Sequence, residues 1–184
     1  MTQTMYQTQD TKTSEMPWRM PDADSAADNI LNQALGFCAQ KMRLGDAQTV
    51  IDRLQQGDRN ACSYCHYSIA EQVSASLGAL DKNVKAAYMF EHDATPEDIC
   101  FSENECTPLV HLIVWVERKT EALNSLVAML DRALAKRLAQ LIGPRELQYV
   151  LDVQVIDDTE VERRTGYAAL LSSIHHRPLK VWER

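Results

Sequence analysis

Two cysteines and a histidine form the stretch of this sequence whose residue types and spacing come closest to a chemical motif. The stretch is Cys62-Ser-Tyr-Cys65-His66. Two thiolates at this spacing can bind one tetrahedral zinc ion, and Cys100 and Cys106 can supply the other two ligands. Five residues separate Cys100 from Cys106, so the second pair does not repeat the spacing of the first. Zinc binding through these four cysteines is therefore one hypothesis for this chain.

Other interpretations of the Cys62–Cys65 pair stay open. Free cysteines are often buried as small apolar side chains, and we expect reduced cysteines that simply pack. A redox pair is a further option, but thioredoxin-like proteins place it between a strand and a helix, whereas a helical hairpin is predicted to precede it here. The Cys-x-x-Cys-His pattern also attaches c-type haem. That attachment takes place outside the cytosol, and the N-terminal residues lack the features of an export signal.

Asp152 is the carboxylate with the clearest claim to a function, because it lies within a predicted strand between apolar residues. A solvated sheet face or edge explains it equally well. His111 lies inside another apolar strand, where a histidine is more often hydrogen-bonded within the core than used as a ligand or base. His175 and His176 follow a predicted helix, and we expect them to be polar residues at its end.

Known catalytic templates are missing from the sequence. It contains no Gly-rich phosphate loop, no Gly-x-Ser-x-Gly and no His-Glu-x-x-His. The connection 91–108 carries six acidic residues, but their irregular spacing matches no calcium loop. A solvated charged loop is the simpler interpretation, although loops of this length are often functional.

The composition excludes several classes of protein. The net charge of −7 argues against a general nucleic-acid binder and against docking on an anionic membrane, because both need a basic surface. No stretch approaches the roughly 20 apolar residues that span a bilayer. With no export signal, we expect a cytoplasmic protein. The odd number of cysteines, five, fits thiols or metal ligands better than a disulfide framework.

These candidate residues must be positioned by an element pattern that is strongest between residues 108 and 158. An apolar strand over 109–116 is followed by an amphipathic helix that begins at Glu121 and ends at Gly143-Pro144. A second alternating strand over 149–156 completes a strand–helix–strand unit. Its residues Tyr149, Leu151, Val153 and Val155 share one face, which leaves Asp152 on the other.

The remaining elements surround this unit. Residues 1–24 have the composition of a disordered tail, and residues 25–60 are predicted to form a helical hairpin with helices over 26–43 and 47–56. The hairpin cannot bury its apolar stripe alone, so it must pack on the rest of the chain or on a second copy. Further predicted elements are a helix from Asn60 to about Leu80, a strand over 84–90, a helix over about 160–173 and a strand over 179–183.

The order of elements over 61–184 resembles the small nucleotidyltransferase-like domain. The strands of that domain correspond to 84–90, 110–116 and 150–156, and Asp152 matches the family's third acid. The chain departs from the family after the first strand, where Phe90-Glu91-His92-Asp93 replaces a Gly-Ser turn. Leu109 and His111 occupy the positions of the family's acid pair. Two-metal nucleotidyl transfer needs those carboxylates, so the resemblance implies a degenerate, non-catalytic member.

The sequence therefore predicts an α+β protein with a small mixed sheet of three to four strands, covered by helices and preceded by an N-terminal helical hairpin. Its predicted function is that of a non-catalytic interaction or regulatory module, which self-associates through residues 26–56 or binds a protein partner. A zinc-binding protein using Cys62 and Cys65, or a metal-dependent nucleotidyl transferase using Asp152, is the alternative. No cofactor other than possible zinc is indicated.

Overall fold

The structure is a computed structural model that describes residues 23–90, 109–143 and 147–184. It confirms the α+β class. In chain order the elements are α1 (Ala23–Met42), α2 (Ala47–Gln55), α3 (Arg59–Leu80), β1 (Val84–Met89), β2 (Val110–Val116), α4 (Glu121–Ile142), β3 (Leu151–Asp157), α5 (Asp158–Arg163), the 3-10 helix η1 (Gly166–Ser172) and β4 (Leu179–Glu183). The predicted tail falls almost entirely on residues 1–22, which lie outside the described residues.

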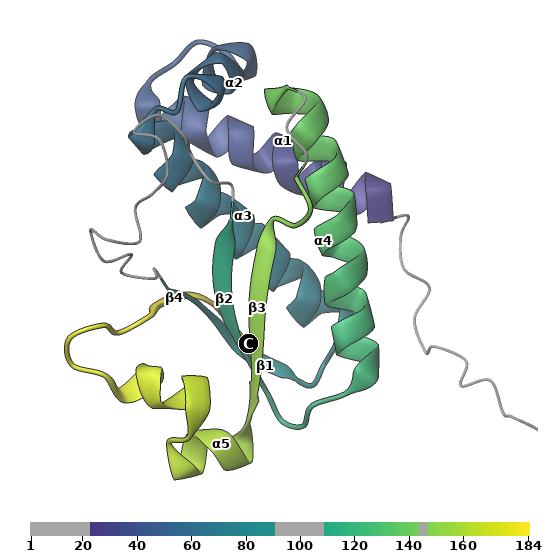
Figure 1. Ribbon diagram of the computed structural model, residues 1–184, viewed down its shortest axis with the longest axis vertical. Helices are drawn as coiled ribbons and strands as arrows, with labels where there is room; N and C mark the ends of the chain where they lie inside the picture. Colours follow the sequence, from purple (N-terminus) through teal and green to yellow (C-terminus); the bar gives the residue numbers. More distant parts are fainter. Residues whose placement is uncertain (1–22, 91–108, 144–146) are drawn as a thin grey trace, which may run out of the picture.

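The described strands form one mixed four-stranded sheet in the order β3-β2-β1-β4. β1 runs antiparallel to β2 and β4, whereas β2 and β3 are parallel. A parallel pair needs a long crossover connection, and α4 supplies it, as the strand–helix–strand pattern predicted. The Thr120 side chain caps α4 by accepting a hydrogen bond from Leu123 N at 3.2 Å, and α4 ends at Gly143, whose φ of 103° suits glycine. Figure 1 shows α4 running beside β3.

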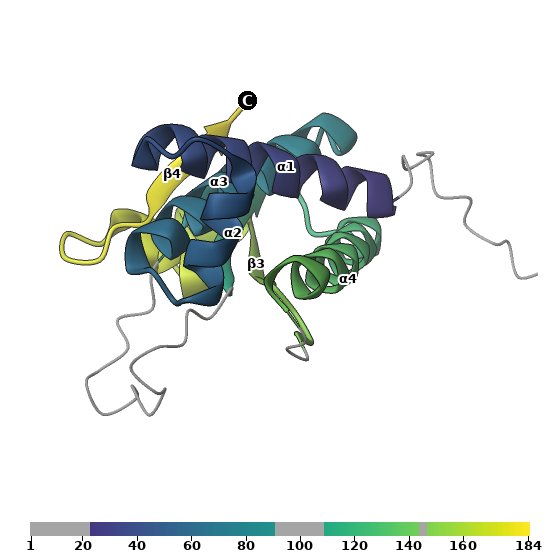
Figure 2. The ribbon, with the colours of Figure 1, turned by 90° about the horizontal axis from the view of Figure 1, so that it is seen from above.

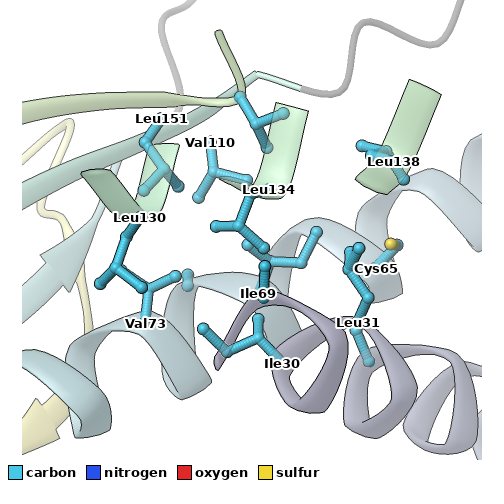
Figure 3. Packing of buried hydrophobic residues seen from close by; sticks show 14 of the residues in the cluster. Ile30, Leu31, Cys65, Ile69, Val73, Val110, Leu130, Leu134, Leu138 and Leu151 are labelled. Atoms are coloured by element: carbon cyan, nitrogen blue, oxygen red, sulfur yellow. The ribbon is translucent and has the colours of Figure 1, made fainter. Parts of the chain in front are cut away.

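One face of the sheet, called here the helical face, packs against α3 and α4, and α1 packs on these two helices. Figure 3 shows Leu130 and Leu134 of α4 together with Ile69 and Val73 of α3 in this core. These side chains are almost completely buried. The leucine spacing that predicted α4 is therefore the spacing of side chains that contact the core.

The N-terminal hairpin shares this core. The apolar stripe of α1, which includes Leu31 and Leu35, is buried against α3 and α4, and Figure 2 shows α1 extending from α3 to α4. Asp46 caps α2 by accepting a hydrogen bond from Thr49 N at 2.7 Å. Of the two arrangements that the sequence left open, the structure shows the stripe packed on the rest of the chain.

The predicted helix over 160–173 is wrong in detail. Two shorter elements, α5 and η1, replace it, separated by Arg164 and Gly166 in left-handed conformations with φ of 53° and 55°. The helix also begins earlier, because Asp157 accepts a hydrogen bond from Glu160 N while the Glu160 carboxylate accepts one from Asp157 N. This capping box starts α5 directly at the end of β3.

The opposite face of the sheet, called here the second face, carries a smaller cluster. Phe90, Ile113, Ile156 and Ala168 are its buried members. Asp158 at the start of α5 is tied to this face by two donors. Its carboxylate accepts hydrogen bonds from Lys85 Nζ at 2.7 Å and from Trp115 Nε1 at 2.8 Å.

The hydrogen bonds of the Asp158 carboxylate predict that the folded protein loses stability in acid. The hydrogen bonds from Lys85 and then from Trp115 hold the pKa of Asp158 below its usual value of roughly 3.9. A depressed folded-state pKa stabilises the protein above the unfolded-state pKa, and the effect is lost as the pH falls through the folded value. We expect the thermal midpoint of Asp158→Asn to fall less between pH 6 and pH 3 than that of the unmodified protein, as measured by circular dichroism. Parallel curves would contradict this assignment.

Candidate functional site

Side chains on the second face lie in rows across the strands, and the row at one end of the sheet places a histidine beside a carboxylate. Phe90 lies at the end of β1, and its backbone N–H donates to His111 O on β2 at 3.2 Å. His111 is in turn paired with Asp152 on β3. The next row holds Tyr88, Ile113 and Gln154. The row Phe90–His111–Asp152 is the candidate site.

The His111–Asp152 pair is the best-defined contact in this row. His111 Nδ1 lies 2.9 Å from Asp152 Oδ2, and the two side chains are 20% and 35% exposed. An ionised carboxylate only accepts hydrogen bonds, so the proton of this bond is on Nδ1. The other carboxylate oxygen, Oδ1, accepts a hydrogen bond from Gln154 Nε2 at 2.9 Å. Both oxygens of Asp152 are therefore used by neighbouring side chains, and the imidazole is fixed in orientation.

The strands reach this register because β3 is anchored at its first residues. The carboxylate of Asp131, on α4, accepts hydrogen bonds from Val150 N at 2.7 Å and from Leu151 N at 2.8 Å. The carbonyl of Val150 then accepts a hydrogen bond from Val110 N at 2.7 Å. These bonds align the starts of β2 and β3. A slip of one residue would move Asp152 to the helical face.

Aromatic side chains continue the row beyond His111. The ring of Phe90 lies with its centroid 5.4 Å from that of His111 and 5.7 Å from that of Tyr167, on η1. Both contacts are tilted, which is a favourable arrangement of ring quadrupoles. Tyr167 is 38% exposed, so this aromatic group is accessible from solvent.

A cavity of about 260 Å³ opens beside Phe90. Its walls are the end of β1, with Met89 and Phe90, and the segment 175–179 that leads into β4. His175, His176 and Arg177 bring hydrogen-bond donors to one wall, and Pro178 and Leu179 are apolar. His175 and His176, predicted to be polar helix-end residues, follow η1 and line this cavity.

The arrangement places an oriented imidazole beside a group of aromatic rings. A histidine whose Nδ1 donates to a carboxylate is held in one tautomer, as in general acid–base sites. The adjoining rings offer a surface for stacking. Across the ranges 23–90, 109–143 and 147–184, no group of three or more His, Cys, Asp or Glu residues is arranged to hold a metal ion.

The predicted zinc ligands lie elsewhere. Cys62 and Cys65 are on the first turns of α3 and are buried in the core. Cys62 is disulfide-bonded, so the expectation of reduced cysteines does not hold for it, and it would need reduction to act as a thiolate ligand. Cys100 and Cys106 lie outside the described residues. Zinc binding by these four cysteines stays a prediction.

Cys65 has a different neighbour from the one that the motif suggested. It contacts Cys38 on α1, and both thiols are free. Cys38 donates to the carbonyl of Ala61 at 3.9 Å. The hydrogen bond from Cys65 lowers the pKa of the Cys38 thiol, while that bond and burial raise the pKa of Cys65. The two side chains join α1 to α3, in line with the expectation of thiols that pack in the core.

Sequence reasoning identified Asp152 but not its partner. His111 was expected to be a hydrogen-bonded core residue, and its bond to Asp152 was not foreseen. A signal was present, because each residue interrupts an apolar run, His111 between Val110 and Leu112 and Asp152 between Leu151 and Val153. Phe90, Tyr167 and the cavity wall 175–179 carried no signal, since they meet only through the β1–β4 pairing and the position of η1.

Comparison of the chain with protein-family models, curated proteins and solved structures gives no match. The resemblance to nucleotidyltransferase-like domains therefore stays a prediction from the order of elements. Within the described ranges, no helix has the length and apolar character needed to cross a membrane.

Proposed function

We propose that this protein is a non-catalytic interaction or regulatory module that binds a small planar ligand on the second face, along the row Phe90–His111–Asp152. The observation that carries the proposal is the 2.9 Å contact between His111 Nδ1 and Asp152 Oδ2. It orients a half-buried imidazole beside a solvent-accessible aromatic group. Ligand sites commonly combine apolar walls with a few fixed polar groups in this way.

The engagement of Asp152 supports a binding role over metal-dependent nucleotidyl transfer. In that reaction carboxylates hold the cations that bridge the triphosphate. Here the two oxygens of Asp152 accept hydrogen bonds from His111 and Gln154. Its neighbour across the sheet is a histidine, where the family resemblance calls for an acid.

An acid–base enzyme is the second candidate. A histidine oriented by a carboxylate is the minimal group for proton transfer, and this contact is the observation that favours the candidate. Such an enzyme would bind substrate against Phe90 and Tyr167 and exchange its proton through the His111 ring. Both candidates use the same surface. Only the enzyme would convert its ligand into a product.

Nuclear magnetic resonance titration of the full chain tests the binding role. Benzoate, benzamidine and adenosine serve as anionic, cationic and neutral planar probes. We expect at least one of them to shift the amide signals of Phe90, His111 and Asp152 saturably. Asp152→Ala should lower the affinity for that probe at least fivefold, because His111 loses its orienting partner.

Asp52→Ala is the matched control, since Asp52 is an exposed carboxylate on α2 and its loss changes the net charge equally. If no probe shifts second-face signals, or if both variants weaken binding alike, the binding role is wrong. Release of pyrophosphate from nucleoside triphosphates with magnesium measures turnover. We expect equal background release from the unmodified protein and Asp152→Ala, and release lost in that variant would favour metal-dependent nucleotidyl transfer over the binding role.

A further inference from the structure

We propose that the cavity between the end of β1 and residues 175–179 binds the phosphoryl group of a small organic phosphate, with the planar part of the ligand against Phe90. This inference rests on the proposed function and names the class of its ligand. Its basis is that Arg177 and two histidines line the cavity together with Phe90, which also belongs to the row Phe90–His111–Asp152.

The wall of this cavity carries a positive charge, at Arg177, although the chain as a whole is acidic. The protein is acidic overall, with a net charge of −7, yet His175, His176 and Arg177 follow one another along the cavity. In the described part of the chain, no carboxylate lies within ion-pair distance of Arg177. Lys180, the next cation, is 2.8 Å from Glu183 and is therefore paired within the chain. Arg177 is the charge that a ligand would meet.

The positive charge of the Arg177 guanidinium affects the pKa of Tyr88, a residue of the second face. Burial raises the pKa of the Tyr88 hydroxyl, and the positive charges of Lys180 and Arg177 oppose that rise. Tyr88 is paired with Lys180 across β1 and β4, in the row next to Phe90. Arg177 lines the cavity together with Phe90, the aromatic residue of the row in which the ligand is proposed to lie.

The donor set suits a phosphoryl group better than a carboxylate. Arginine presents several N–H donors in a planar fork that matches phosphate oxygens, and each imidazole adds a further donor. A phosphoryl group offers three acceptor oxygens, one more than a carboxylate. The fork of Arg177 can therefore engage two phosphoryl oxygens, and the imidazole of His175 can engage the third.

The size of the cavity limits the rest of the ligand. Sites for drug-sized molecules occupy about 300–1,000 Å³. At about 260 Å³, this cavity is near the lower limit, enough for a phosphoryl group and a single ring. The ring would contact Phe90, whose own ring contacts His111 at 5.4 Å between centroids. A monocyclic aryl phosphate is the simplest probe of this geometry.

Isothermal titration calorimetry with phenyl phosphate, phenol and inorganic phosphate tests the inference. We expect phenyl phosphate to bind at least tenfold tighter than phenol, because only the phosphate ester reaches Arg177. Arg177→Gln should remove that advantage. Phe90→Leu should weaken the binding of phenyl phosphate more than that of inorganic phosphate, since only phenyl phosphate has a ring that can contact Phe90.

Arg163→Gln is the matched control, because Arg163 is an exposed arginine on α5 and its loss changes the net charge equally. Equal losses in Arg177→Gln and Arg163→Gln, or equal affinities for phenyl phosphate and phenol, would overturn the inference. If planar probes still shift the signals of His111 and Asp152 in that case, the proposed function stands and only the phosphate assignment fails. If no probe shifts them, both fail.

Discussion

Replacing Leu31 by glutamate is expected to remove most of the folding free energy of this protein. Leu31 lies in the middle of α1, is 3% exposed and belongs to the core that α1 shares with α3 and α4. Figure 3 shows it among the core side chains, near Cys65. Glutamate would leave an uncompensated charge there, a change that costs more than about 4 kcal/mol. Domains are stable by only about 5–15 kcal/mol.

Chemical denaturation followed by circular dichroism measures this effect. Asn32→Glu is the control, because Asn32 is the next residue of α1 and is exposed. We expect that variant to change the free energy of unfolding by less than about 0.5 kcal/mol, as for most surface substitutions. A cooperative transition of Leu31→Glu at the denaturant concentration of the unmodified protein would show that α1 does not pack as described.

This result bears on self-association, which the sequence predicted for residues 26–56. A charge at Leu31 or Leu35 was the natural way to disrupt such an oligomer. Both side chains are buried within the chain, so a charge there would disrupt folding first. Self-association stays a prediction, and its test needs exposed residues of α1 or α2. Light scattering of the Asn32→Glu variant is a suitable measurement.

Replacing Gly78 by alanine is expected to destabilise the protein by about 3 kcal/mol, through overpacking. A Cβ atom on Gly78 would overlap two ring atoms of Trp182, far inside van der Waals contact. The ring of Trp182 must therefore move, and β4 with it. A shift of β4 would also disturb Arg184, the residue that follows it, whose side chain donates a hydrogen bond to the carbonyl of Gly78 at 2.7 Å. The loss of this hydrogen bond adds to the destabilisation. The thermal midpoint should fall by roughly 6–12 °C for a chain of this length.

Gly36→Ala is the matched control for this substitution. Gly36 also lies within a helix, α1, but no neighbouring atom is within 4 Å of the place that a Cβ would take there. Alanine has the higher helix propensity, so we expect Gly36→Ala to stabilise the protein by up to about 1 kcal/mol. In the double variant Gly78→Ala, Trp182→Ala, the clash is gone. The double variant should then have nearly the same free energy of unfolding as Trp182→Ala alone. If Gly78→Ala destabilises Trp182→Ala as much as it destabilises the unmodified protein, the cause is not the contact with Trp182.

Much of the fold could be predicted because it depends on local periodicity. The leucines of α4 recur at helical spacing, and Thr120 and Gly143 mark its ends, so the helix was predicted within one residue. The helix after β3 was less predictable. Its capping box at Asp157 and Glu160 is visible in the sequence, but the break at Arg164 is not, since nothing local requires arginine to adopt a positive φ.

The candidate site was only half predictable, for a related reason. Asp152 stood out because a carboxylate interrupts an apolar alternation. His111 is 41 residues away in the sequence, and its distance from Asp152 depends on the β2–β3 register. That register is fixed by Asp131 and by backbone bonds that no local pattern predicts. The cavity beside Phe90 depends in the same way on the β1–β4 pairing.

The amino-acid sequence by itself determined which side chains of the long helices share a face, and that Asp152 lies on the face of its strand opposite to Leu151 and Val153. This follows because the periods of helices and strands are properties of the local chain. Only the tertiary structure decided that Asp152 meets His111, and that Cys65 meets Cys38. Such contacts depend on register and packing between distant segments, which are set by the whole core.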